Sequence, residues 1–424
     1  MGKFCIIGAG PAGLASMKTL LDAGMEFDCF ERRDAIGGHW NTDYDALHLI
    51  TSSKVTGYEG FPMPADWPIF PSRDLMLKYF HLFADAHDLK KFVTFNTEVT
   101  HAEPLPGDGP VGAHGWRVTT SDGKTADYEG IFVANGHLWD EKIPDMQGTF
   151  TGKQIHSGSY KNSQDIEGTR VLVIGSGNSG CDLAVDAAQS RLDTHIVIRR
   201  GHYFQPKTFF GKPRAELEFM KEFNFEEQDL IARLMMRLSV GTAAEYPGMP
   251  PVDHRTLAEG PPIVNNLLLY WIQHGRITVR PGIERFDGKM VYFTDGTSGE
   301  FDTILWATGF HASLPFMDTS VFAMQDNVPL RVGAAVLPIG VEKLYLIGMI
   351  APRGPQPPTY PTQAQLAVKM VNIHRGSNKG YVPLTDHLDK SQEREWRIDI
   401  LRPIWLDQVS DTHAKLDAIA LGQQ

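Results

Sequence analysis

The sequence predicts an α/β fold made of two similar domains, with the second inserted into the first. A short apolar strand runs into a glycine-rich turn twice, at Phe4–Gly24 and again at Arg170–Cys181. About one domain length after each turn, the chain has a short strand that ends in small residues. This strand is IFVANG for the first turn and ILWATG for the second. A repeat of this size indicates two copies of one folding unit. The segments VEKLYLIGMIAP and PTYPTQAQLAVKMV predict a last strand and helix that return to the first unit.

The first turn is typical of dinucleotide binding. Gly8, Gly10 and Gly13 have GxGxxG spacing between a buried-type strand and a helical pattern. The first glycine makes the tight turn, the second lets the backbone approach a pyrophosphate, and the third lets the helix pack close. The helix N-terminus adds N–H donors and a partial positive charge. Glu31 ends the next strand, 18 residues beyond Gly13, where a carboxylate can accept from both ribose hydroxyls.

The second turn, RVLVIGSGNSGC, predicts a site for a phosphorylated dinucleotide. Gly175, Gly177 and Gly180 repeat the spacing, but the following strand ends in Arg199 and Arg200. An acid there would repel a 2′-phosphate, whereas guanidinium groups bind it through charge-assisted hydrogen bonds. We therefore expect NADPH at this turn. The alternative, two exposed arginines at a sheet edge, stays open.

Composition excludes several functions. A formal net charge of −11 over 424 residues argues against non-specific nucleic-acid binding. No window approaches 18 uncharged apolar residues, so we expect a soluble, cytoplasmic protein with no membrane segment. Cys5, Cys29 and Cys181 form no CxxC pair and are predicted to be buried free thiols. No metal-ligand spacing is present, so no metal site is expected.

The order of these parts predicts the domain boundaries. Residues 1–152 form the first part of one domain, 153–167 a linker, 168–312 the inserted domain, and 313–424 the return segment with a C-terminal tail. Within the insert, EEQDLIARLMMRLS predicts a helix with an apolar stripe. Core packing or a dimer face explains that stripe: Leu230, Ile231, Leu234, Met235 and Leu238.

The linker begins in the stretch FTGKQIHSGSY, residues 150–160, which carries a resemblance to a known family. Phe150, Gly152, His156 and Tyr160 match all four fixed positions of the signature of class B flavin-dependent monooxygenases. The chain resembles a soluble bacterial-type flavin-containing monooxygenase over nearly its whole length. The similarity includes GAGPAG, GGHW, VANGHLWDEKIP, GSGNSG and DTILWATGF. The resemblance implies that the linker joins a FAD domain to an NADPH domain.

The resemblance also implies an activity. In this family NADPH gives a hydride to FAD, and the reduced flavin captures O2 as a C4a-hydroperoxide that a soft nucleophile attacks. The implied partners are molecular oxygen and a small amine or sulfide, with neither nucleic acid nor a membrane. A homodimer is left open, and the substrate is not identified.

Site residues follow from the resemblance by position. FAD would contact Trp40, Thr308 and Gln363 in addition to the first turn and Glu31. His156 and Tyr160 would brace the nicotinamide. Arg199 or Arg200 would bind the 2′-phosphate. The two pyrophosphates would be held by Gly8, Gly10, Pro11, Ala12 and Gly13 for FAD and by Ser176, Gly177, Asn178 and Ser179 for NADPH.

Two departures from the family pattern bear on this assignment. Many relatives place an asparagine in the stretch that aligns with LITSSK, where this chain has Thr51 beside Ser52. A hydroxyl offers one donor, whereas an amide offers two donors and a carbonyl, so this departure bears on how long a hydroperoxide would last. The first domain also has Asn135 where a threonine is usual.

Three rival functions stay open. A Baeyer–Villiger monooxygenase would act on ketones, although those proteins usually end the signature with tryptophan rather than Tyr160. A flavin disulfide reductase needs a redox CxxC pair, which is absent. A non-catalytic flavin-binding sensor would share both nucleotide sites.

Overall fold

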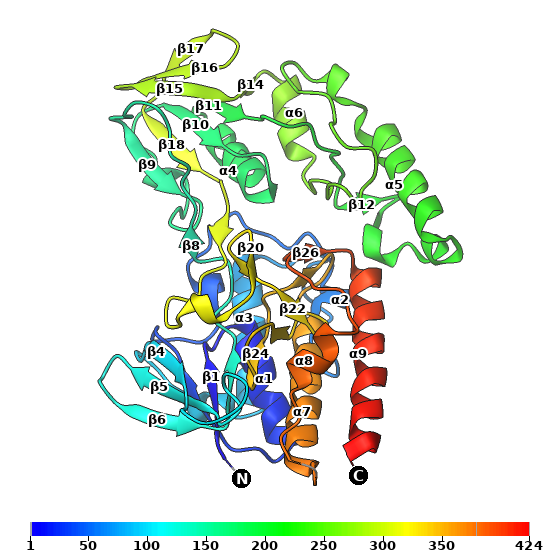
Figure 1. Ribbon diagram of the computed structural model, residues 1–424. Coiled ribbons are helices and arrows are strands. Elements are labelled where there is room, and N and C mark those ends of the chain that lie inside the picture. The colour runs from blue at the N-terminus through cyan, green and yellow to red at the C-terminus, as the bar shows by residue number, and fades with distance from the viewer. Residues whose placement is uncertain (1, 379, 424) are drawn as a thin grey trace.

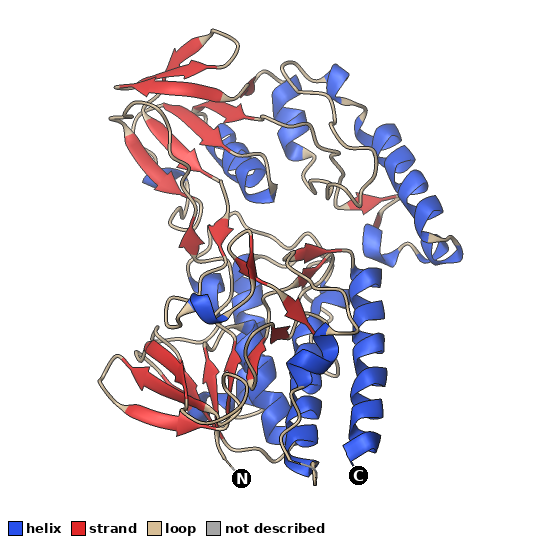
Figure 2. Cartoon of the chain, in the orientation of Figure 1, coloured by secondary structure: helices blue, strands red, loops and turns tan. Residues whose placement is uncertain are grey.

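The computed structural model describes residues 2–378 and 380–423 and has two parts, stacked one above the other in Figure 1. Each part is built around a five-stranded sheet whose strands are all parallel. Helices flank both sheets, as Figure 2 shows by colour. The predicted α/β class with two Rossmann-like units is confirmed.

The sheet of the lower part has the order β24-β7-β1-β2-β3. All four residues of β1 are buried and apolar, as a central parallel strand requires. The predicted return strand and helix are β24 and α7, and α7 packs on α1. The elements are β1 (Phe4–Ile7), α1 (Pro11–Asp22), β2 (Phe27–Phe30), α2 (Ser53–Thr56), α3 (Arg73–Ala86), β3 (Val93–Thr94), β7 (Gly130–Val133), β24 (Leu344–Leu346), α7 (Thr359–Gly376), α8 (Leu384–Asp389) and α9 (Arg402–Gln423).

The sheet of the upper part has the order β14-β11-β10-β18-β9. Its edge strand β9 comes from the stretch that the sequence predicts as a linker, and it pairs in parallel with β18. The signature is therefore partly a strand of the upper sheet. The elements are β9 (Lys153–His156), β10 (Arg170–Ile174), α4 (Asn178–Gln189), β11 (Asp193–Val197), α6 (Leu267–Gln273), β14 (Ile277–Arg280) and β18 (Thr303–Trp306).

The internal repeat extends to the antiparallel three-stranded sheets. In both parts such a sheet comes just before the strand that leads into the ANG or ATG motif, which is β7 in the lower part and β18 in the upper part. The two sheets are β4 (Val99–Pro104), β5 (Trp116–Thr120) and β6 (Thr125–Tyr128), and β15 (Ile283–Asp287), β16 (Met290–Phe293) and β17 (Ser298–Glu300). The order strand, helix, strand, helix, strand, three-stranded sheet, strand is thus the same in both parts.

Two short strands fix how the parts face each other. β8 (Asp140–Glu141) follows β7, β19 (Phe310–His311) follows β18, and the two pair in an antiparallel arrangement. Each strand leaves the carboxyl edge of its own sheet. The carboxyl edges of both sheets therefore face one shared boundary, where open α/β sheets bind ligands.

The upper part carries an extension between β11 and α6. It holds β12 (Thr208–Phe209), β13 (Lys212–Pro213) and α5 (Phe225–Val240). Asn224 begins α5 with a capping box, since its side chain accepts from Glu227 N and the Glu227 carboxylate accepts from Asn224 N. The predicted helix is confirmed, but its stripe divides: Met235 is buried, whereas Leu230, Leu234 and Leu238 are exposed.

The remaining features agree with an ordinary globular interior. Cys5, Cys29 and Cys181 are buried free thiols, as predicted. Among the described residues, no helix combines the length and apolarity that crossing a membrane requires. The other strands are β20 (Met324–Gln325), β21 (Val328–Pro329), β22 (Arg331–Val332), β23 (Leu337–Pro338), β25 (Ala351–Pro352) and β26 (Asp399–Ile400).

Candidate active site

The first glycine turn forms a tight cradle at the carboxyl end of β1. Gly8 has φ +99°, which side chains rarely adopt. A Cβ on Gly13 would stand 1.9 Å from the Gly8 carbonyl oxygen, so only glycine lets α1 approach the turn. A Cβ on Gly10 would meet only Gly38, at 3.6 Å, so that face of the turn is open. The open face is where a pyrophosphate could approach the backbone.

This cradle opens into a cleft. Glu31 lines the cleft and is buried. Its carboxylate accepts from Ala9 N at 2.8 Å and from Arg33 N at 2.9 Å, which fixes it beside the turn. Gly8, Gly10, Pro11 and Ala12 line the same cleft, so the structure brings these predicted residues together.

Gly348 and Tyr360 from the return segment also line the cleft. Behind Gly348, the buried Gln363 accepts from Gly348 N at 2.8 Å, while its Nε2 has no partner among the described residues. A buried amide donor without a partner is costly, so it suits a bound acceptor. The glycine cradle, the anchored carboxylate and this amide together fit a flavin adenine dinucleotide.

His39 and His137 line the cleft, and Trp40 lies beside it through its contact with His39. Trp40 packs on the His39 ring, with centroids 5.2 Å apart, and on Phe80. His137, which the sequence analysis did not single out as a site residue, lines the cleft with its Nδ1 3.0 Å from the Gly348 carbonyl oxygen. Burial lowers the pKa of His137 to about 4, so its neutral ring donates Nδ1–H to that carbonyl.

The second glycine turn repeats the first at the end of β10. Gly175 has φ +114°, and a Cβ on Gly180 would stand 2.0 Å from the Gly175 carbonyl oxygen. Around Gly177 no atom lies within 4 Å of a built Cβ, so the N-terminus of α4 is open. Asn178 accepts from Val264 N at 3.0 Å, which ties the turn to the extension. This turn contains the four residues that are predicted to hold the NADPH pyrophosphate: Ser176, Gly177, Asn178 and Ser179.

The two arginines beyond β11 differ in their surroundings. Arg200 donates to Asp253 at 2.6 Å. Arg199 is exposed and has no hydrogen bond or ion pair with any described residue. Of these two arginines, Arg199 is therefore the one whose charge no described carboxylate offsets.

A loop of the lower part lies against the second turn. Tyr44 is buried in the upper core, and its hydroxyl donates to Asp182 on α4 at 2.9 Å and lies 3.5 Å from the Ser179 hydroxyl. Burial raises the pKa of Asp182. Tyr44 thus stands beside the N-terminus of α4. Sequence reasoning missed it because no motif contains it.

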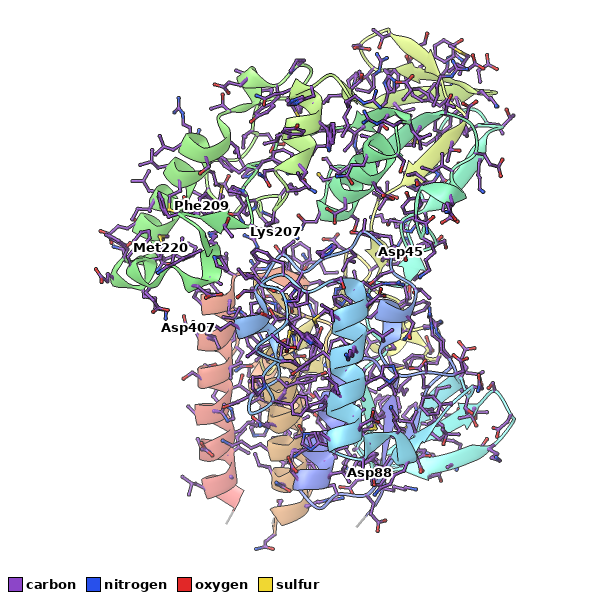
Figure 3. All side chains as sticks on the ribbon, turned by 180° about the vertical axis from the view of Figure 1, so that it is seen from behind. Asp45, Asp88, Lys207, Phe209, Met220 and Asp407 are labelled. Carbon is purple, nitrogen blue, oxygen red and sulfur yellow. The ribbon has the colours of Figure 1, made fainter. Side chains whose placement is uncertain are left out.

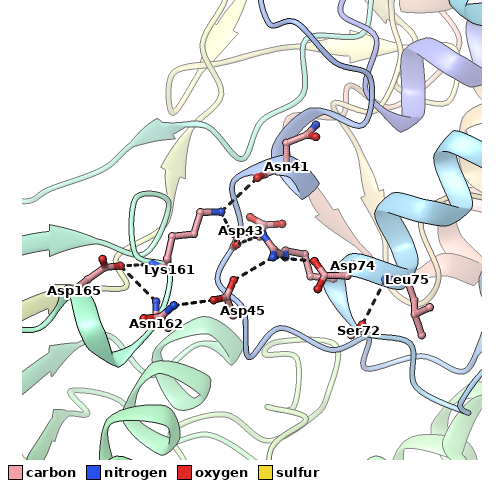
Figure 4. Close-up of polar contacts among 10 residues, drawn as sticks. Asn41, Asp43, Asp45, Ser72, Asp74, Leu75, Lys161, Asn162 and Asp165 are labelled. Carbon is pink, nitrogen blue, oxygen red and sulfur yellow. Dashed lines mark hydrogen bonds and ion pairs between the residues drawn. The ribbon is translucent and has the colours of Figure 1, made fainter.

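The same loop is held by two residues that directly follow the signature segment, as Figure 4 shows. Lys161 Nζ donates to the Asp43 carbonyl oxygen at 3.0 Å, and Asn162 Nδ2 donates to Asp45 at 2.8 Å. Arg73 at the start of α3 pairs with Asp45 at 3.0 Å. This polar network joins the two parts next to the second turn.

The predicted signature residues are buried. His156 lies at the end of β9, 3.7 Å from Glu141 of β8, and its ring contacts Phe310 of β19. Burial lowers the pKa of His156. The Tyr160 hydroxyl donates to Asp186 on α4 at 2.6 Å. Direct bracing of a nicotinamide by this hydroxyl stays a prediction, since the proton is already donated to α4.

Thr51, Ser52 and Thr308 lie outside the first cleft. Thr56 donates to the Ser52 carbonyl oxygen, so the 2.9 Å contact between the Thr51 and Thr56 hydroxyls uses the Thr51 proton. Ser52 donates across the boundary to Glu216 of the extension at 2.5 Å. Thr308 donates to the Lys142 carbonyl oxygen.

The extension covers this side of the boundary. Lys207 Nζ lies 5.3 Å from the centre of the Phe70 ring. In Figure 3, which views the molecule from behind, Lys207 and Asp45 are both labelled along the boundary. The predicted residues therefore form groups around one boundary rather than a single cluster.

Comparison with known proteins gives this arrangement a family. The sequence profile of a family described as flavin-binding monooxygenase-like matches residues 1–397. Flavin-containing monooxygenase 5 of Oryctolagus cuniculus is 31% identical over 432 residues, covering 91% of this chain and 79% of its own. Dimethylaniline monooxygenase (N-oxide-forming) 2 of the same species is 30% identical over 394 residues, covering 87% and 73%.

Solved structures share the fold at lower sequence identity. Cyclohexanone monooxygenase from Rhodococcus sp. Phi1 bound to NADP+ superposes with a TM-score of 0.73 at 18% identity, covering 99% of this chain and 97% of its own. Flavin-containing monooxygenase from Stenotrophomonas maltophilia superposes with a TM-score of 0.65 at 20% identity, covering 87% and 99%. By its sequence the chain belongs to the flavin-binding monooxygenase-like family and is a flavin-dependent oxidoreductase.

Proposed function

We propose that this chain uses NADPH and O2 to transfer one oxygen atom to a soft nitrogen or sulfur atom of a small molecule. The observation that carries the proposal is the β8–β19 pairing, which turns the carboxyl edges of both sheets toward one boundary. A hydride donor at the second turn and a hydride acceptor at the first would then meet there. Residues 1–152 with 313–424 would bind FAD, and 168–312 would bind NADPH across the 153–167 linker.

Bound flavin would supply hydride acceptance and oxygen activation, and the protein would supply position and exclusion of water. Gly10 and Glu31 would hold FAD at its pyrophosphate and ribose, and the Gln363 amide would donate to it. Gly177 and Arg199 would hold the pyrophosphate and the 2′-phosphate of NADPH. Tyr44 and Lys161 would keep the two sites apposed.

Relatives support the choice of substrate class. One matched enzyme is named for forming N-oxides, and the S-allyl-L-cysteine S-oxygenase of Allium sativum shares the fold with a TM-score of 0.62 at 20% identity. The cyclohexanone monooxygenases share the fold as well, so ketones are the second candidate. Tyr160, where ketone-oxygenating relatives usually have tryptophan, favours amines and sulfides.

The test is oxygen incorporation by the FAD-loaded protein. Under ¹⁸O2 with NADPH, a thioether and a tertiary amine should give products that carry one ¹⁸O atom, and cyclohexanone should give little lactone. The protein should release FAD on denaturation, since FMN lacks the adenosine that Glu31 is placed to bind. Consumption of NADPH with only hydrogen peroxide formed from every substrate would contradict the proposal.

A further inference from the structure

The exposed face of α5 has no partner within the described chain. Leu230, Leu234 and Leu238 are 60%, 54% and 78% exposed. They recur every four residues and so form one stripe along the helix. In Figure 1, α5 runs along the outer edge of the upper part, with its other face turned to the extension. A contiguous apolar stripe of this kind marks an interaction surface.

The surface beside the stripe is hollowed. A groove lies along α5. Its walls come from α5, from the loop that follows it, from α6 and from residues 202–204, and they include Leu230, Arg233, Leu234, Arg237, Tyr246, Met249 and Leu269. The groove could receive side chains of a partner that packs on α5.

Two exposed charges border the stripe. Neither Glu226 nor Arg237 has a side-chain hydrogen bond or an ion pair among the residues that the structure describes, although Arg237 is near enough to contribute to the lowered pKa of the Glu245 carboxyl, after the hydrogen bonds from Thr242. Arg233, by contrast, pairs with Asp229 at 2.7 Å. Glu226 and Arg237 are eleven residues apart, about three helical turns, so they lie on the same flank of the stripe at opposite ends.

These charges make the surface complementary to itself. When two copies of a helix pack antiparallel about a twofold axis, each flank meets the same flank running in the opposite direction. The midpoint of Glu226 and Arg237 nearly coincides with the midpoint of Leu230 and Leu234. A single twofold axis near these midpoints therefore places Glu226 of each copy opposite Arg237 of the other copy. It also places Leu230 of each copy opposite Leu234 of the other.

We propose that α5 is the contact helix of a homodimer in which two copies pack antiparallel along this stripe. A membrane surface fits less well, because anionic lipids favour a helix rich in lysine and arginine, whereas this flank carries both signs. The interface lies away from the glycine turns, so this inference does not depend on the proposed chemistry.

The experiment is sedimentation velocity of the FAD-loaded full chain over a concentration series. Leu234→Glu should give a monomer, whereas Leu421→Glu, at a leucine on α9 that is 73% exposed, should leave the dimer intact. Glu226→Arg and Arg237→Glu should each raise the dimer dissociation constant about tenfold, since two exposed ion pairs become like-charge contacts. The double reversal should restore association, and FAD content should stay unchanged throughout.

Three results would overturn the proposal. A wild-type chain that is monomeric across the series would remove the dimer. A dimer that Leu234→Glu and the single reversals leave intact would place its interface elsewhere. Co-sedimentation of the wild type, but not of Leu234→Glu, with phosphatidylserine-containing vesicles would assign the stripe to a membrane.

Discussion

Arg199 and Arg200 follow the same strand but differ in what they already bind. Because Asp253 pairs with Arg200 and no residue in the described part of the chain pairs with Arg199, we expect Arg199 to carry most of the preference for NADPH over NADH. A charge-assisted contact is worth roughly 1.5–3 kcal/mol. Arg199→Ala should therefore lower the ratio of kcat/KM for NADPH to that for NADH by about 10- to 150-fold.

Arg200→Ala is the matched control at the same strand end. It should change the coenzyme ratio much less, since the Asp253 carboxylate beside its guanidinium offsets its charge and would repel a phosphate. Steady-state kinetics with both coenzymes measure the ratio. An Arg200→Ala variant with the larger loss would reverse the assignment, and a wild type indifferent to the two coenzymes would remove it.

Tyr160 is predicted to act through α4. Its buried hydroxyl is a hydrogen-bond donor to Asp186, so Tyr160→Phe removes that donor from the carboxylate. The free energy of unfolding should fall by about 1–3 kcal/mol. Because α4 begins at the second turn, less oxygenated product and more hydrogen peroxide should form per NADPH. Asp186→Asn should keep the hydrogen bond and most of the stability; equal product yields from all three proteins would leave Tyr160 a purely structural residue.

At the scale of the element, the glycines of each turn have two different roles: some allow close packing of the helix, and others leave the turn open to a ligand. A Cβ on Gly13 or Gly180 would collide with a carbonyl oxygen of its own turn, whereas one on Gly10 or Gly177 would meet no close atom. Gly10→Ala should therefore weaken FAD binding, and Gly177→Ala should raise the KM for NADPH, with little loss of stability. Gly13→Ala and Gly180→Ala should lower the free energy of unfolding by about 1–3 kcal/mol.

Thermal unfolding of the proteins without added cofactor, together with titrations of FAD and NADPH, separates the two effects. Each pair contains the same substitution in the same kind of turn, so the pairs control for each other. Loss of stability in Gly177→Ala as large as that in Gly180→Ala would show that the open face is not a binding face.

At the scale of the whole molecule, local patterns predicted the two units, and long-range contacts decided how they meet. The glycine turns, Glu31 and the return strand follow from residues adjacent in sequence, so the sequence analysis could identify them. Tyr44 docking on α4, Ser52 bonding to Glu216 and the pairing of β8 with β19 join residues more than 100 positions apart. No spacing rule relates such residues, so the sequence predicts a linker where the structure has the edge strand β9.

The lower part also carries a buried acid whose charge state affects the stability of the whole chain. The Glu342 carboxyl is 1% exposed, accepts from Thr385 N at 3.0 Å and lies 4.0 Å from His374 Nε2. Burial raises the pKa of Glu342 to about 7 and lowers the pKa of His374 to about 4. Both side chains are therefore neutral between these values.

The two groups act on stability in opposite directions. A carboxyl whose pKa is raised in the folded state stabilises most below its usual value of 4.5, and that contribution is lost as the pH rises through 7. A histidine whose pKa is lowered contributes above its usual 6.5, and that contribution is lost as the pH falls through 4. Of these two groups, only Glu342 ionises above neutral pH, and its ionisation lowers the free energy of unfolding.

Glu342→Gln is the last prediction, because glutamine keeps the neutral shape and the acceptor for Thr385 N. A rise from 4.5 to about 7 corresponds to about 3 kcal/mol at full ionisation. The variant should unfold at a higher temperature than the wild type at pH 9 and at the same temperature at pH 5. Glu395→Gln provides a control of opposite sign: burial alone would raise its pKa, but hydrogen bonds from Arg397 lower it, so this variant should be less stable at neutral pH. Calorimetric melting of the three proteins across pH measures both effects, and parallel curves for Glu342→Gln and the wild type would show that Glu342 ionises in the folded chain as freely as in water.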